Sequence, residues 1–117
     1  YVQYTYARTC SLLRKGEMEL TDNVDYSILT DKESFNVIKK LEGFKAAVLS
    51  AHDKYEPFFI TRYIVSLAQE FNRFYHECPI VVEDIEVKKA RLLLTQSVNT
   101  VLKKGMELLG METPEKM

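Results

Sequence analysis

The sequence predicts an all-α protein, a bundle of about five helices that forms a single domain over residues 1–117. Apolar residues recur at spacings of three and four along most of the chain, which is the period of an amphipathic helix. No stretch alternates with a period of two for long enough to form a sheet. Residues 80–82 (IVV) alone are strand-like, and we expect an extended connector there.

The first helix is expected over residues 1–15, with Gly16 as its end. Its apolar residues follow one another at intervals of four, four and three: Val2, Tyr6, Cys10 and Leu13. Residues 16–29 then mix Asp, Asn, Thr and Glu with isolated apolar residues. This composition predicts a loop, with one turn around Tyr26 and Leu29.

Two short helices separated by Gly43 are expected next. Thr30 and Glu33 have the spacing of a capping box, in which the two side chains bind free backbone N–H groups at a helix start. The apolar stripe of the second helix comprises Phe35, Ile38 and Leu41. The third helix carries Phe44, Ala47, Val48 and Ala51.

A long fourth helix is expected from Pro57, which suits a first turn, to about His76, because no Gly or Pro interrupts this stretch. Pro79 pushes Cys78 out of helical geometry and ends the helix. Its predicted core stripe comprises Ile60, Ile64, Leu67, Ala68, Phe71 and Tyr75.

The last helix is expected to begin between residues 83 and 86 and to end at Leu109, with Gly110 as a left-handed cap. The residues expected to face inward are Val87, Ala90, Leu94, Val98, Val101, Leu102, Leu108 and Leu109.

Composition excludes several classes of protein. The sequence contains no run of about 18 apolar residues, so no membrane span is predicted. Two cysteines and two histidines are too few for a convincing four-ligand zinc site, so we expect reduced thiols, as in a cytoplasmic protein, and no metal. The chain opens on Tyr1 without a signal segment, and we expect it to be a fragment of a longer polypeptide.

Catalytic motifs are also missing from the sequence. There is no Gly-rich phosphate loop, nucleophile elbow or His-Glu-x-x-His motif. His76 and Cys78 lie at a helix end, where a catalytic pair is seldom held, and Cys10 is best interpreted as a small core residue. We therefore expect binding and no catalysis.

Charge predicts that any nucleic-acid site is local, because a net charge of −1 leaves few cations to release counterions over a whole surface. Each basic cluster taken alone is ordinarily a solvated face. The clusters comprise Arg8, Arg14 and Lys15; Arg62 and Arg73; and Lys88, Lys89 and Arg91.

Tyr4 and Arg8 are four residues apart and so share one face of the first helix. An aromatic ring beside a planar guanidinium can stack on an unpaired base and bind its edge or phosphate. Spacing alone favours the alternative, in which Tyr4 packs inward and Arg8 lies in water.

Three strings at the start, middle and end of the chain together resemble the C-terminal anticodon-binding domain of arginyl-tRNA synthetases, which are class I enzymes. They are residues 1–8 (YVQYTYAR), 71–78 (FNRFYHEC) and 108–117 (LLGMETPEKM). Because they span essentially the whole chain in the right order, the resemblance is specific although each string alone is not.

The resemblance implies an anticodon pocket. The Tyr-x-x-x-Arg element that lines it in the family falls on Tyr4 and Arg8, and the family's aromatic pair falls on Phe74 and Tyr75, with Tyr75 in the pocket and Phe74 structural. Met117 matches the terminal Met, whose main chain lies near the pocket. The implied partners are the anticodon loop of arginine tRNA and a catalytic domain of the same parent chain.

The HIGH-like and KMSKS-like motifs with which class I synthetases use ATP do not occur in this sequence, so we expect neither catalysis nor a bound cofactor in this fragment. Two alternatives stay open. One is a helical protein-interaction module whose aromatic residues belong to the core. The other is the related domain of another class I synthetase such as the cysteinyl enzyme, although the EKM ending favours the arginyl enzyme.

Overall fold

A computed structural model describes residues 1–16, 29, 31–54, 57–80 and 82–115 of the chain. Within these residues all regular secondary structure is helical, which confirms the predicted all-α class. The five helices are α1 (Val2–Gly16), α2 (Lys32–Glu42), α3 (Phe44–Lys54), α4 (Phe58–Glu77) and α5 (Ile85–Leu108). No helix within the described ranges is both long and apolar enough to cross a lipid bilayer.

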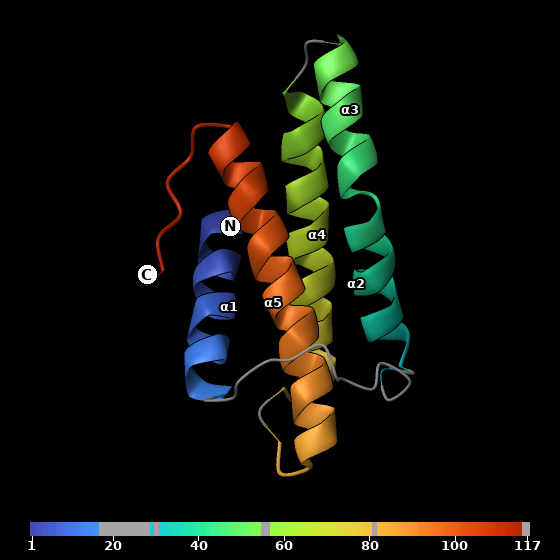
Figure 1. The fold of residues 1–117 in the computed structure, drawn as a ribbon, viewed down its shortest axis with the longest axis vertical. Helices are drawn as coiled ribbons and strands as arrows, with labels where there is room; N and C mark the ends of the chain where they lie inside the picture. Colours follow the sequence, from blue (N-terminus) through green and yellow to red (C-terminus); the bar gives the residue numbers. More distant parts are fainter. Residues whose placement is uncertain (17–28, 30, 55–56, 81, 116–117) are drawn as a thin grey trace.

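Helix α4 is the centre of the bundle, because it packs against each of the other four helices. Figure 1 shows α2 and α3 following each other along one side of α4, while α1 and α5 lie side by side on the other. The apolar residues without exposed surface come mainly from α4 and α5: Val37, Leu67, Ala68, Phe71, Phe74, Ala90, Val98, Leu102 and Met106. These residues form one continuous core.

The cap of α2 differs from the predicted capping box. Asp31 is the N-cap, and its carboxylate accepts hydrogen bonds from the Ser34 backbone N–H at 2.8 Å and from the Ser34 hydroxyl at 2.9 Å. Thr30 lies outside the described residues. The predicted capping box of Thr30 and Glu33 is wrong, because the N-cap of α2 is Asp31. An Asp is also a strong N-cap, and this one has its partner, Ser34, three residues on.

Two apolar residues lie outside the core, Phe35 from the predicted apolar stripe of α2 and Leu108 from the residues expected to face inward in α5. Phe35 is 60% exposed and Leu108 is 57% exposed. In α2 the buried residues are Ser34 and Val37, so Phe35 lies about 100° round the helix from Ser34 and away from the core. In α5 the last buried residue is Met106, and Leu108 lies two positions beyond it, on the opposite side.

The other helix ends agree with the sequence to within about one residue. Gly43 separates α2 from α3, and Cys78 ends α4 in an extended conformation before Pro79. Ile80 is buried and belongs to the core, whereas Val81 lies outside the described residues. The turn expected around Tyr26 also lies outside them, and Leu29 is buried.

The end of α5 turns the chain back toward α1. Gly110 has a φ of 72°, the left-handed conformation expected for it. The N–H of Met111 donates to the carbonyl of Met106 at 2.9 Å and that of Gly110 to Glu107 at 3.0 Å, which is a Schellman motif. The tail then runs beside α1 (Figure 1), where the Gln3 side chain donates to the Glu112 carbonyl at 3.0 Å.

Candidate functional site

Three of the four predicted site residues meet where α1 lies against the end of α4. The guanidinium carbon of Arg8 is 4.4 Å from the centroid of the Tyr75 ring and 5.4 Å from that of the Tyr4 ring. Both separations are within the range of a cation–π interaction. The fourth residue, Met117, lies outside the described residues.

The packing of α1 explains why these side chains stand at the edge of the core. Thr5, Tyr6 and Thr9 are buried against the bundle, whereas Tyr4 is 54% exposed. The alternative in which Tyr4 packs inward is therefore wrong. On α4, Phe74 has no exposed surface and Tyr75 is half-buried. Phe74 is therefore structural, as the resemblance implied, and the core stripe predicted for this helix is corrected in one respect, since Phe74 is fully buried and Tyr75 only partly so.

Asn72 is a member of the cluster that the sequence did not indicate. Its side-chain oxygen accepts a hydrogen bond from Arg8 Nη1 at 2.7 Å. Its nitrogen donates to the Tyr1 hydroxyl at 2.9 Å and to the Thr5 hydroxyl at 3.0 Å. Asn72 precedes Tyr75 by three residues and so shares its face of α4, but an amide on a helix is common and carries no signal by itself.

A hollow of about 450 Å³ that is open to solvent lies beside Tyr4, Arg8 and Tyr75. The remaining residues around it come from α1 and the tail: Ala7, Ser11, Leu12, Arg14, Lys15 and Glu115. Three cations and one carboxylate thus surround the hollow, although the whole chain has a net charge of −1. This local excess of positive charge, beside two rings, suits a ligand that is flat and anionic.

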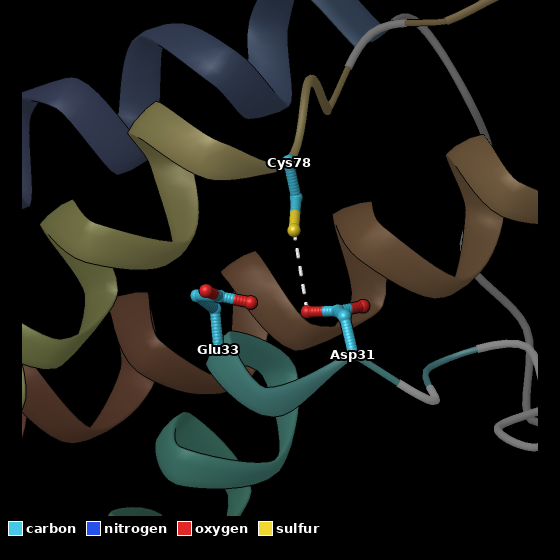
Figure 2. Close-up of side chains that lie close together, drawn as sticks. All are labelled: Asp31, Glu33 and Cys78. Atoms are coloured by element: carbon cyan, nitrogen blue, oxygen red, sulfur yellow. Dashed lines mark hydrogen bonds between the residues drawn. The ribbon is translucent and has the colours of Figure 1, made fainter.

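A second cluster, formed by Asp31, Glu33 and Cys78, contains atoms of the types that bind metals within 4.8 Å of one another. Figure 2 shows Cys78 pointing from the end of α4 toward Asp31, with Glu33 beside it at the start of α2. The thiol donates to Asp31 Oδ2 at 3.2 Å, and the same carboxylate caps α2. These hydrogen bonds explain the cluster as a link between two helix ends.

The protonation states at this cluster agree with a structural role. Burial, together with the hydrogen bond to Asp31, raises the pKa of Cys78 to about 11. Burial acts to raise the pKa of Asp31 too, but the hydrogen bonds from Ser34 and Cys78 outweigh it and lower that pKa below 3.8. A thiol is a nucleophile or metal ligand as the thiolate, so a raised pKa disfavours both roles.

Cys10 is likewise structural. It is partly buried against the core, and its sulfur accepts a hydrogen bond from Asn99 Nδ2 at 3.2 Å. This contact agrees with its interpretation as a small core residue.

Comparison with known proteins identifies the family. The model of the DALR anticodon binding domain matches residues 2–117. The chain is 51% identical to the arginine–tRNA ligase of Halothermothrix orenii and 48% identical to that of Clostridioides difficile strain 630, in each case over 117 residues. Each match covers 100% of this chain and 21% of the relative, so the chain spans about a fifth of their length.

A solved structure is similar in fold as well as in sequence. The arginyl-tRNA synthetase of Thermus thermophilus superimposes with a TM-score of 0.92 at 31% identity, covering 100% of this chain and 21% of that one. These matches confirm the resemblance stated from the sequence and favour the arginyl over the cysteinyl type. The chain therefore belongs to the DALR anticodon binding domain family, in the form carried by arginyl-tRNA synthetases.

Proposed function

We propose that this chain is the anticodon-recognition domain of an arginine–tRNA ligase and that the hollow beside Tyr4, Arg8 and Tyr75 binds the anticodon loop of arginine tRNA. Residues 1–117 form this single domain, at the C-terminal end of a longer cytoplasmic chain. A catalytic domain of that chain uses ATP to join arginine to the tRNA. The observation that carries the proposal is the position of Arg8 over two aromatic rings at an open, locally positive hollow.

The aromatic rings provide the stacking surface. Proteins that recognise single-stranded RNA stack splayed bases on aromatic or guanidinium planes and read the base edges with hydrogen bonds. Tyr4 and Tyr75 flank the guanidinium of Arg8, and Tyr4 is more than half exposed. A base can therefore stack on the rim of the hollow without any rearrangement of the core.

Arg8 provides donors for a base edge or a phosphate. A guanidinium has five N–H groups. One of them is donated to Asn72, and no other hydrogen bond from Arg8 is formed to the residues that the structure describes. The remaining donors are thus available to a ligand in the hollow, where Arg14 and Lys15 add positive charge.

The genetic code supplies a reason for such a pocket. Every arginine codon has G in the middle, so every arginine anticodon has C there, and one base can serve as an identity signal. Met117, whose main chain we predict to lie near this base, would complete the pocket from the tail. Glu115, two residues before it, already borders the hollow, which supports this position for the end of the chain.

Binding by the isolated chain should be weak and sensitive to salt. Affinity for nucleic acid depends strongly on the number of cations that replace counterions. Three basic residues border the hollow in a chain whose net charge is −1. The rest of the affinity for tRNA is expected to come from other parts of the parent enzyme.

The test measures binding of an arginine-tRNA anticodon stem-loop at low salt, with C or U at the middle position. We expect the U substitution to weaken binding. Tyr75→Ala should cost about 1 to 3 kcal/mol, the value of one stacked base, and Tyr75→Phe much less. Arg8→Lys should be nearly as harmful as Arg8→Ala, because Lys lacks the planar fork.

Arg62→Lys and Arg62→Ala are matched controls, since Arg62 is an exposed arginine of α4 that does not border the hollow. Thermal unfolding of every variant separates loss of binding from loss of fold. Equal affinity for the C and U stem-loops would refute base recognition. If instead Tyr4→Ala and Arg8→Ala left RNA binding unchanged, the chain would fit a helical protein-interaction module better.

A further inference from the structure

We propose that Asn72 is a positioning residue for Arg8, and that its side-chain amide fixes the direction in which the guanidinium presents its free donors to the hollow. This inference deepens the proposed function and rests on it for its effect on RNA binding. The claim about Arg8 itself concerns the protein without RNA and can be tested separately.

The hydrogen bond between the two side chains is short. Arg8 Nη1 lies 2.7 Å from Asn72 Oδ1, which is at the short end of the range for bonds with a charged donor. The two residues are 64 positions apart in sequence and link α1 to α4. Asn72 thus acts from a core helix on a side chain at the surface of another.

The orientation of the Asn72 amide follows from its neighbours. Arg8 can only donate, so it must face the amide oxygen. On the other side, the Thr5 hydroxyl donates its single hydrogen to the Tyr1 carbonyl at 3.1 Å. Thr5 must therefore accept from Asn72, whose nitrogen lies 3.0 Å away.

This arrangement requires a side chain that is both acceptor and donor. Thr5 has no exposed surface, so its hydroxyl has no access to solvent as a substitute partner. An Asp at position 72 would still accept from Arg8, but it could not donate to Thr5 and would add negative charge beside the hollow. An amide is the group that satisfies both partners on α1, the Arg8 guanidinium and the Thr5 hydroxyl.

Stacking alone would leave the guanidinium free to turn about its Nε–Cζ bond, which exchanges Nη1 and Nη2. The rings of Tyr4 and Tyr75 hold Arg8 at 5.4 and 4.4 Å but do not select which edge of the guanidinium faces the hollow. The hydrogen bond to Asn72 selects it. Binding is tighter when a recognition group is already held in its bound orientation, because less freedom is lost.

The first test needs no RNA. Nuclear magnetic resonance of the Arg8 guanidinium should show separate Nη signals in the parent chain, because the bond to Asn72 slows rotation about the Cζ–N bonds. Asn72→Ala should merge these signals, and Asn72→Asp, which keeps an acceptor, should keep them separate. Merged signals in the parent, or separate signals in Asn72→Ala, would overturn the proposal.

The second test is a double-mutant cycle on affinity for the arginine anticodon stem-loop. Asn72→Ala should weaken binding about tenfold in the parent, the scale of a lost hydrogen bond to a charged group, and less than about twofold when Arg8 is already Ala. Equal losses in both backgrounds would show that Asn72 acts independently of Arg8, and would overturn the proposal.

Thermal unfolding of all four proteins of the cycle is the accompanying measurement. Should Asn72→Ala fail to fold, Asn72→Ser replaces it, because a serine hydroxyl keeps a polar group at this position and is one bond too short to reach Arg8. If Arg8→Ala itself left RNA binding unchanged, the proposed function would be wrong, and the resonance signals would still decide whether Asn72 orients Arg8.

Discussion

Gly105 allows α5 to pack directly onto Ile64 of α4, and a methyl group added there has a predictable effect. A Cβ on Gly105 would lie closer than 3.0 Å to Cγ2 of Ile64, a separation that real Cβ atoms essentially never show. Ile64 is 1% exposed, and its Cγ2 is attached directly to Cβ on a β-branched side chain with one preferred rotamer in a helix. Gly105→Ala therefore forces the helices or Ile64 to move.

Two opposing effects determine the magnitude. Overpacking a core by one methyl group costs about 1 to 3 kcal/mol. Replacing Gly by Ala inside a helix stabilises it by about 0.8 to 1 kcal/mol. We expect a net loss of about 1 kcal/mol, which corresponds to a fall in Tm of roughly 3 to 6 °C for a domain of this size.

Gly43→Ala is the matched control, because it makes the same chemical change at a site with room. Gly43 has a right-handed conformation, with φ −84° and ψ −5°, and its added Cβ would meet the Lys40 carbonyl at 3.4 Å and the Tyr63 ring at 3.6 Å. These are ordinary contacts. Reduced freedom of the unfolded chain should then stabilise the protein by about 0.4 to 1 kcal/mol.

The assay is thermal and urea unfolding followed by circular dichroism at 222 nm. A further variant, Ile64→Ala, removes the colliding methyl group, so Gly105→Ala should cost less in that background than in the parent. Equal changes in Tm for the Gly105 and Gly43 variants would refute the argument. So would full additivity of Gly105→Ala and Ile64→Ala.

Three further predictions concern the helix ends. Asp31→Ala should cost about 1 kcal/mol as a lost N-cap, and Asp31→Asn much less. Because the pKa of Asp31 lies below 3.8, its ionised form should stabilise the parent above pH 4, and this stabilisation should be lost as the pH falls further. An acid titration of both variants beside the parent checks this. Burial, and to a lesser extent the hydrogen bond to Asp31, raises the pKa of Cys78 from 9.0 to about 11. The folded state therefore keeps a proton that the unfolded thiol loses, and the free energy of unfolding should fall as pH rises from 9 to 11. Urea midpoints at pH 8 and 10 should show a smaller fall for Cys78→Ser than for the parent, and equal falls would contradict this. Gly110→Ala places a Cβ at a φ of 72°, so it should lower the free energy of unfolding by about 1 to 2 kcal/mol and weaken stem-loop binding by displacing the tail. An unchanged free energy of unfolding together with an unchanged affinity would contradict this prediction.

Local patterns in the sequence determined the helices and most of their ends. The spacing of apolar residues, the Gly43 break, Pro79 and the left-handed Gly110 all act within a few neighbouring residues, so they can be interpreted without knowledge of the fold. The cap of α2 was misplaced by one residue, because Thr30 and Asp31 are adjacent and both are good caps. The packed structure decided for Asp31, whose carboxylate also binds Cys78 from the end of α4.

The candidate site, like the helices, was predicted from the sequence only in part. The residue types at Tyr4, Arg8 and Tyr75 were evident from the sequence through their resemblance to a family, whereas spacing alone favoured an inward Tyr4. Only the packing of α1 against α4 placed Tyr4 outside, set Arg8 over Tyr75 and supplied Asn72 as its partner. Periodicity describes one helix at a time, and which face of α1 meets which face of α4 depends on the whole core. Contacts between residues more than 60 positions apart are therefore a property of the tertiary structure.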